Sequence, residues 1–341
     1  MTESKAMIVG LAGAEMTPAE LAFIADQRPW GYILFARNIV DADQLKRLTQ
    51  SIRDASGRDD VPILIDQEGG RVQRLKPPLA PLYPPASILA QIYRTDRKAG
   101  LRATWLMSRL HAFDLQRYGI NVDCLPVLDI PVAGSHSIIG DRAYGADADV
   151  VIAMASAAVD GLMAGGVLPV AKHVPGHGRA RSDSHLELPV VDTALDELEA
   201  TDFKPFAALS GVAMAMTAHV VYSAIDAANP ATTSKTLISD IIRRHIGFDG
   251  LLMSDDVSMK ALSGTFESRT AAIFAAGCDV ALHCNGDMDE MLAIAGETPV
   301  LAGDSLRRAN AVSACRRPAD NANEAAARDE FDALLSSGAM A

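Results

Sequence analysis

An excess of basic charge is absent from this 341-residue chain. Lys and Arg together number 31 against 43 Asp and Glu, which gives a net charge of −12 at pH 7. Proteins that bind nucleic acids use a basic surface that releases counterions, so this acidic balance argues against a nucleic-acid partner. Hydrophobic residues make up 49% of the chain and charged residues 22%, which is the composition of a folded globular protein.

Paired cysteines are absent as well. The four cysteines, Cys124, Cys278, Cys284 and Cys315, are scattered and form no C-x-x-C pair. This spacing excludes a disulfide framework and a zinc ribbon. A reducing compartment suits such a pattern, and we expect a cytoplasmic protein.

The sequence also lacks an uninterrupted membrane span. Residues 207–225 carry no Asp, Glu, Lys or Arg and are long enough to cross a bilayer, but Ser210, Gly211 and His219 interrupt them. The short apolar stretch 6–14 resembles the core of a signal peptide, but two glycines interrupt it, and we interpret it as a first β-strand. We therefore expect no membrane partner.

Short apolar runs rich in β-branched residues alternate with longer amphipathic stretches, which predicts β/α units around a parallel sheet. Eight strands are expected, at residues 7–11, 31–35, 62–65, 121–125, 167–171, 213–218, 251–253 and 280–283. Helical patterns between them include residues 45–54, 97–118, 147–164, 196–209, 234–245 and 267–276. No G-x-G-x-x-G follows the first strand, which weakens a dinucleotide-binding alternative. Eight units over roughly 290 residues predict a single (β/α)₈ TIM-type barrel, a fold that takes about 250 residues.

The chain from about residue 298 is rich in Ala and in charged residues, with a helical pattern that Arg316-Arg317-Pro318 interrupts. It is too short for a second domain. We predict a barrel domain over residues 1–298 and a helical C-terminal extension over residues 299–341.

Polar residues follow several of the predicted strands, where TIM barrels carry their reactive groups. A single such residue often only caps the next helix, but five strand ends that converge predict an active site. The segments are Asp66-Gln67-Glu68, Asp129, Lys172-His173, His219 and Asp255-Asp256.

The stretch K-H-V-P-G-H-G at 172–178 is followed by D-S-H at 183–185. Glycine and proline around His177 predict an irregular loop whose side chains lie above the barrel. The spacing lets the Asp183 carboxylate reach the imidazole of His185, which would raise the pKa of His185 and let it exchange protons near neutrality. The alternative is an aspartate that closes a turn beside a solvated histidine.

A metal site is a second alternative, because His173, His177, Asp183 and His185 offer nitrogen and oxygen ligands. However, the two first histidines do not lie on a helix as in H-E-x-x-H, and their glycine and proline neighbours make a poor ligand frame. We expect neither a metal nor another cofactor.

Two carboxylates end the stretch F-D-G-L-L-M-S-D-D at 248–256. Asp255, the first to leave the strand, should point into the barrel mouth, whereas Asp256 should point away or cap the next helix. A carboxylate in the barrel mouth can attack the anomeric carbon of a sugar and form the covalent intermediate of retaining glycosidases.

Together with D-Q-E-G-G-R-V-Q-R at 66–74, these motifs resemble glycoside hydrolase family 3. More narrowly, they resemble its single-domain bacterial β-N-acetylglucosaminidases of the NagZ type. The resemblance extends from about residue 31, where I-L-F-A-R-N also fits, to about residue 286.

The resemblance implies that Asp255 is the nucleophile and that Asp183 and His185 form an acid/base dyad. It also implies sugar contacts from five further residues: Asp66, Arg74, Arg142, Lys172 and His173. The alternatives are that Arg74 and Arg142 form surface ion pairs and that Lys172 extends along the barrel rim. We predict a structural role for Glu68, with bonds to loop backbone, and leave open whether His219 only satisfies a backbone group.

The implied activity is hydrolysis of terminal β-linked N-acetylglucosamine with retention of configuration, and the implied substrates are peptidoglycan-recycling fragments. Three other reactions remain open: phosphorolysis, because a neutral histidine does not repel phosphate, action on β-glucosides, and attack by the substrate's own acetamido group. A barrel that binds sugars without catalysis is a further alternative. The expected partner is a small glycan, and the sequence does not predict an oligomeric state.

Overall fold

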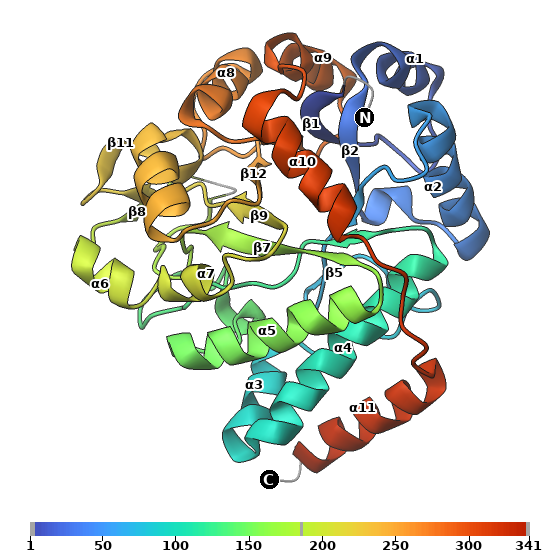
Figure 1. The fold of residues 1–341 in the computed structure, drawn as a ribbon, viewed down its shortest axis with the longest axis vertical. Helices are drawn as coiled ribbons and strands as arrows, with labels where there is room; N and C mark the ends of the chain where they lie inside the picture. The colour runs from blue at the N-terminus through green and yellow to red at the C-terminus, as the bar shows by residue number, and fades with distance from the viewer. Residues whose placement is uncertain (1–3, 185–186, 339–341) are drawn as a thin grey trace.

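A computed structural model describes residues 4–184 and 187–338 and contains a closed barrel of eight parallel strands (Figure 1). The order around the barrel is β1 (Lys5–Gly10), β13 (Val280–His283), β12 (Leu251–Asp256), β9 (Met214–Thr217), β7 (Leu168–Val174), β6 (Val122–Asp123), β3 (Ile63–Ile65) and β2 (Pro29–Leu34). Each predicted strand overlaps one of these, so the predicted barrel is confirmed.

The barrel interior is a packed core. One buried cluster joins side chains from all eight strands: Ile8, Ile33, Leu64, Val122, Val170, Met214, Met253 and Leu282. Strands that are buried on both faces need nearly continuous apolar sequence, and this is the pattern by which the sequence reveals them.

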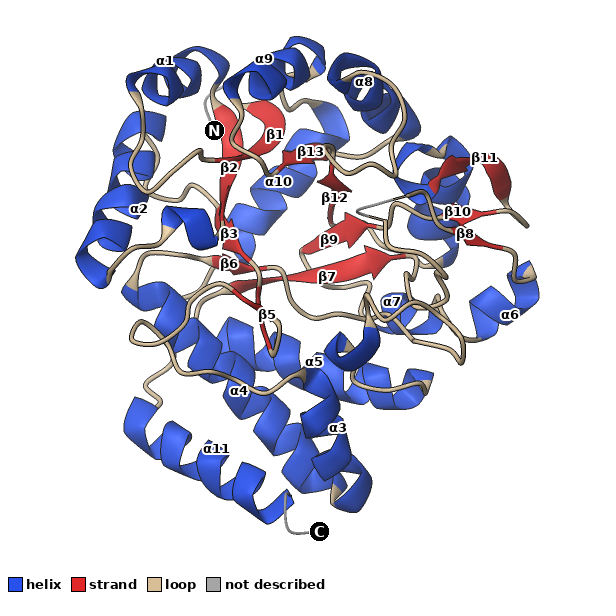
Figure 2. Cartoon of the chain, turned by 180° about the vertical axis from the view of Figure 1, so that it is seen from behind, coloured by secondary structure: helices blue, strands red, loops and turns tan. Residues whose placement is uncertain are grey.

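Helices surround the strands (Figure 2). They are α1 (Pro18–Gln27), α2 (Ala42–Ser56), α3 (Ala86–Thr95), α4 (Arg97–Arg117), α5 (Ala148–Ala164), α6 (Leu195–Ala200), α7 (Lys204–Ala208), the π-type helix η4 (Leu237–His245), α8 (Phe266–Ala276) and α9 (Met288–Glu297). The single helix predicted over residues 196–209 is wrong, because the chain leaves helical geometry at Thr201 and Pro205 begins a new first turn.

An antiparallel hairpin of β4 (Gln67–Gly69) and β5 (Val72–Gln73) follows β3, and the sequence did not predict it. Gly69 and Gly70 have φ values of +95° and +57°, which favour glycine. The Tyr83 backbone fixes the hairpin, since Tyr83 O accepts Gly70 N–H at 2.9 Å and Tyr83 N–H donates to Gln73 Oε1 at 3.0 Å.

A small sheet of β8 (Val190–Val191), β10 (Val221–Tyr222) and β11 (Asp226–Pro230) lies beside the barrel. Residues 207–225, the apolar run noted above, form the end of α7, β9 and β10. Among the described residues, no helix is both long enough and apolar enough to span a membrane.

The C-terminal region forms α10 (Gly303–Cys315) and α11 (Glu324–Gly338), separated where the sequence predicts the interruption. Helix α11 lies against α3 and α4 (Figure 1). Its Arg328 donates to the buried Asp114 carboxylate at 2.7 Å and to the Tyr83 hydroxyl at 3.1 Å, while Tyr83 donates to Asp114 at 2.6 Å. The C-terminal helix is thereby linked to the residue that supports the β4–β5 hairpin.

This contact predicts a difference between two arginines on the same helix interface. Arg328→Ala should lower the free energy of unfolding by about 1–3 kcal/mol, because it removes a partner from a buried carboxylate. Arg102→Ala is the matched control: Arg102 pairs with Glu330 of α11 with side chains 45% and 44% exposed, and its loss should cost about 1 kcal/mol or less. Urea denaturation followed by circular dichroism measures both, and equal losses would contradict the role given to Arg328.

Candidate active site

A cavity of about 420 Å³ opens at the carboxyl ends of the barrel strands, within the size range of small-molecule sites. Six of the eight predicted site residues line it: Asp66, Arg74, Arg142, Lys172, His173 and Asp255. The structure therefore brings together residues that lie far apart along the chain, as the convergence of strand ends predicts.

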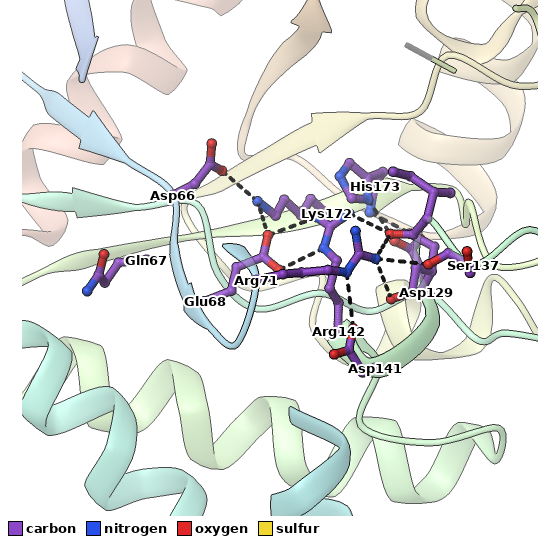
Figure 3. A network of polar contacts seen from close by, with 12 residues as sticks. Asp66, Gln67, Glu68, Arg71, Asp129, Ser137, Asp141, Arg142, Lys172 and His173 are labelled. Atoms are coloured by element: carbon purple, nitrogen blue, oxygen red, sulfur yellow. Dashed lines mark hydrogen bonds and ion pairs between the residues drawn. The ribbon is translucent and has the colours of Figure 1, made fainter. Parts of the chain in front are cut away.

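Lys172 lies at the centre of the polar contacts in this cavity (Figure 3). Its buried Nζ donates to Asp66 Oδ1 at 2.8 Å and lies 2.7 Å from Glu68 Oε1. Burial alone would lower the pKa of this lysine, but the two carboxylates outweigh burial and raise it above its ordinary value. Lys172 therefore stays charged inside the barrel mouth and does not extend along the rim.

Glu68 is held by side chains, so the predicted bonds to loop backbone are wrong. Arg142 donates from Nε and Nη2 to the two Glu68 oxygens, both at 2.8 Å, a bidentate geometry that strengthens the pair. Burial favours the neutral acid, but Arg142 and Lys172 lower the pKa of Glu68 to about 2. The Arg142 side chain is only 10% exposed, which also excludes the surface ion pair considered for it.

Asp66 completes this set of charges. Its Oδ2 accepts from Arg74 Nη2 at 3.0 Å, and Lys172 and Arg74 hold the pKa of Asp66 well below its ordinary value against the effect of burial. Arg71 extends from the hairpin to Asp141 at 3.1 Å and to the backbone oxygen of Ser137 at 2.9 Å. These contacts fix the loop that carries Arg142 (Figure 3).

Asp129 organises the other side of the site. Its Oδ2 lies 2.6 Å from Nδ1 of His173, and its Oδ1 accepts the backbone N–H groups of His173 at 3.2 Å and His177 at 2.6 Å. Burial favours the neutral acid, but the two histidines lower the pKa of Asp129 to about 2. The sequence marks Asp129 as a strand-end residue but does not reveal this anchoring role.

The loop after β7 leads to the predicted acid/base dyad. His177 Nε2 lies 3.0 Å from the hydroxyl of buried Ser184, which follows the half-buried Asp183. His185 lies outside the described residues. In residues 4–184 and 187–338, no group of three or more His, Cys, Asp or Glu side chains could hold a metal ion.

Asp255 and Asp256 are the last two residues of β12, so both belong to the strand and both line the cavity. Asp255 Oδ1 accepts the backbone N–H of Asp256 at 2.8 Å. The Asp256 carboxylate accepts the N–H groups of Ser258 at 3.0 Å and Cys284 at 3.1 Å. The Asp256 carboxylate thus fixes the turns around the site, and it does not cap the next helix, α8, whose N-cap is Thr265.

Phe35 and Arg37 also line the cavity. They come from the I-L-F-A-R-N motif, for which the sequence suggests no individual roles. Arg37 and Arg74 place their guanidinium groups 4.9 and 5.4 Å from the ring centre of Phe35. Arg37 also donates to the backbone oxygens of Leu11 and Cys284. Only the folded barrel brings these residues together, because they follow different strands.

A parallel barrel with paired ions and a strand-end aspartate at its carboxyl end has the arrangement of a barrel glycosidase. The profile "Glycosyl hydrolase family 3 N terminal domain" matches residues 2–309, and the chain belongs to this family of glycoside hydrolases. The chain is 39% identical over 299 residues to the β-hexosaminidase of Chromobacterium violaceum, covering 86% of this chain and 83% of that protein.

A second relative, the β-hexosaminidase of Bordetella pertussis, is 35% identical over 308 residues, which cover 89% of this chain and 87% of that protein. Among solved structures, NagZ from Neisseria gonorrhoeae in complex with N-trifluoroacetyl-D-glucosamine is similar, with a TM-score of 0.85 and 33% identity. That match covers 99% of this chain and 98% of the NagZ chain. The chain is therefore a NagZ-type member of the family.

The lowered pKa values predict how stability depends on pH. A carboxylate whose pKa is lower in the folded state contributes stability above its unfolded pKa and loses it as the pH falls toward the folded value. For Glu68 this range runs from about pH 4.5 to about pH 2. Glu68→Gln should lower the free energy of unfolding at pH 7, because it removes a charge partner of Arg142 and Lys172. Between about pH 4.5 and about pH 2, the free energy of unfolding of this variant should fall less than that of the wild type.

Urea midpoints across this pH range test the prediction. Glu15→Gln, which changes an exposed carboxylate, is the control and should follow the wild-type curve. An unchanged acid dependence in Glu68→Gln would show that the buried pairs do not set the acid stability.

Proposed function

We propose that the protein is a retaining exo-β-N-acetylglucosaminidase with Asp255 as its nucleophile. The observation that carries this proposal is the position of Asp255, at the end of β12 and in one cavity with the paired ions of Asp66, Lys172 and Arg142. The acceptors and donors of these pairs suit sugar hydroxyls, and the carboxylate suits the anomeric carbon.

Sugar binding is assigned to Asp66, Arg74, Arg142, Lys172 and His173. Because Asp66, Arg142 and Lys172 are already paired and each is held by at least two polar contacts, little reorganisation of these three side chains is needed when a sugar arrives. The role of Glu68 is to hold Arg142 and Lys172 in place.

In the first displacement, Asp255 forms a bond to the anomeric carbon while the bond to the leaving oxygen breaks. The imidazolium of His185 gives its proton to that oxygen. In the second, the now neutral His185 takes a proton from water, the water oxygen bonds to the anomeric carbon, and Asp255 leaves as a carboxylate. Asp183 orients the imidazole and stabilises its charged form.

The substrate class is supported by the names of the relatives and by the N-trifluoroacetyl-D-glucosamine bound in the similar NagZ structure. We extend this to terminal, non-reducing N-acetylglucosamine of peptidoglycan-recycling fragments, consisting of N-acetylglucosamine on anhydro-N-acetylmuramyl peptides. This extension rests on the family resemblance and assigns the protein to the cytoplasm.

The nucleophile is tested with nitrophenyl β-N-acetylglucosaminide and nitrophenyl β-glucoside, with and without phosphate. The wild type should hydrolyse the acetamido sugar alone, indifferent to phosphate. Asp255→Ala should lose at least about 10³-fold in rate, because the covalent route is closed. The control Asp26→Ala, at an exposed residue of α1, should keep wild-type activity.

Each other result selects a different account. Turnover that survives in Asp255→Ala would favour attack by the acetamido group, and sugar 1-phosphate formed with phosphate would favour a phosphorylase. No turnover of any aryl sugar by the wild type would favour a sugar-binding barrel.

The acid role of His185 is tested with substrates whose leaving groups differ in basicity. His185→Ala should slow substrates with poor leaving groups by a factor about 10–100 greater than those with activated ones, because only the former need strong protonation. Rates for a nitrophenyl glycoside and a disaccharide give this comparison. Equal losses on both would remove His185 from the acid role.

A further inference from the structure

A buried chain of side chains lies behind Asp255. Thr217 at the end of β9, Thr232 in the 3₁₀ turn Ala231–Thr233 and His219 are all fully buried. The Thr217 and Thr232 hydroxyl oxygens are 2.8 Å apart, and the Thr232 oxygen lies 2.7 Å from His219 Nδ1.

Both ends of this chain meet the backbone of the Asp255–Asp256 pair. The N–H of Asp255 donates to Thr217 Oγ1 at 3.3 Å, and His219 Nε2 lies 2.9 Å from the backbone oxygen of Asp256. The three hydrogen-bonded side chains therefore form a closed loop with the backbone of the two residues that end β12.

The chemistry of the end groups fixes the direction of these bonds. A backbone oxygen only accepts, so His219 Nε2 carries the proton and donates it to Asp256. A neutral imidazole then accepts at Nδ1, so Thr232 donates to His219, and Thr217 donates to Thr232. Thr217 thereby keeps its lone pairs for the N–H of Asp255.

The surroundings of His219 agree with this neutral form. Burial is the largest influence and lowers the pKa of His219, although Asp255 and Asp256 oppose it; His173 is the remaining titratable neighbour and acts with burial. In a protonated His219, the Thr232 hydroxyl would turn to its other neighbour, the backbone oxygen of Ala218 at 3.1 Å.

The three side chains do not act on the sugar themselves. None of the three is among the described residues that line the cavity. Their bonds act on the backbone from which the Asp255 carboxylate extends, and the Asp256 N–H in turn binds Asp255 Oδ1.

We propose that Thr217, Thr232 and His219 are positioning residues that hold the Asp255 carboxylate at the angle and distance needed for attack. This inference rests on the proposed role of Asp255. A displacement of the order of 1 Å by a distant change can cost about 10²-fold in rate, so the loss of one bond in the loop should slow the reaction without weakening sugar binding.

Thr232 offers a matched pair of variants. Thr232→Val keeps the shape of the side chain and removes the hydroxyl, and should lower kcat by about 10–100-fold. KM and the inhibition constant of free N-acetylglucosamine should stay within about twofold, because the cavity walls are unchanged. Thr232→Ser restores the hydroxyl and should recover most of kcat.

His219 gives a second, independent pair. His219→Gln can still donate to the Asp256 oxygen and should retain more kcat than His219→Leu, which cannot. The pH dependence of kcat/KM should keep its limbs in both variants, because a neutral His219 exchanges no proton with the substrate. Thermal unfolding accompanies every assay, and the Thr232 pair remains decisive if a His219 variant fails to fold.

The inference is overturned if Thr232→Val keeps kcat within twofold, if Thr232→Ser loses as much as Thr232→Val, or if KM rises as kcat falls. A shifted pH limb in the His219 variants would also overturn it, because His219 would then act as an acid or base. Asp255→Ala in the same assay separates the two claims. If that variant stays active, the nucleophile assignment fails; if it is inactive while Thr232→Val is fully active, only the positioning role fails.

Discussion

The buried ammonium group of Lys172 is the constraint on which the rest of the site depends. A buried charge is tolerated only with partners, and Lys172 has two, Asp66 at 2.8 Å and Glu68 at 2.7 Å. Arg74 and Arg142 are further partners of these carboxylates, so the set holds three cations and two carboxylates. Each added partner comes from a different segment, and the charges therefore hold the β4–β5 hairpin and the loop before α5 against the end of β7. These ion pairs build one wall of the pocket.

Fixed polar contacts also position the remaining parts of the site. Asp129 binds the ring of His173 and the backbone of His177, which fixes the start of the loop that leads to Asp183. Around Asp255, two threonine hydroxyls and an imidazole bind the backbone of the Asp255–Asp256 pair, directly or through one another. Ion pairs therefore hold the sugar-binding side of the cavity, and hydrogen bonds to the backbone hold the end of β12.

The sequence predicts the barrel well, because its strands are buried on both faces and read as apolar runs such as those of β1 and β13. The sequence also predicts that the reactive residues gather at one end of the barrel, since the carboxyl ends of parallel strands share a face. It predicts the hairpin and the Glu68 contacts poorly. The hairpin depends on two glycines in left-handed conformations and on Tyr83, and Glu68 depends on cations from distant segments; neither leaves a periodic pattern. Pro205 indicates the break between α6 and α7, but the apolar periodicity continues across it and favours a single helix. The sequence shows Arg37 and Phe35 only as members of one motif, and their stacking is seen only in the folded chain.

We propose that Asp255 forms a covalent bond to the sugar. The most direct measurement is mass spectrometry of the enzyme after reaction with a fluorinated N-acetylglucosaminyl fluoride, which slows the second displacement more than the first. We expect one added sugar, located by peptide fragmentation on Asp255. A sugar on another residue, or full turnover of the fluoride without any adduct while Asp255→Ala remains active, would contradict it.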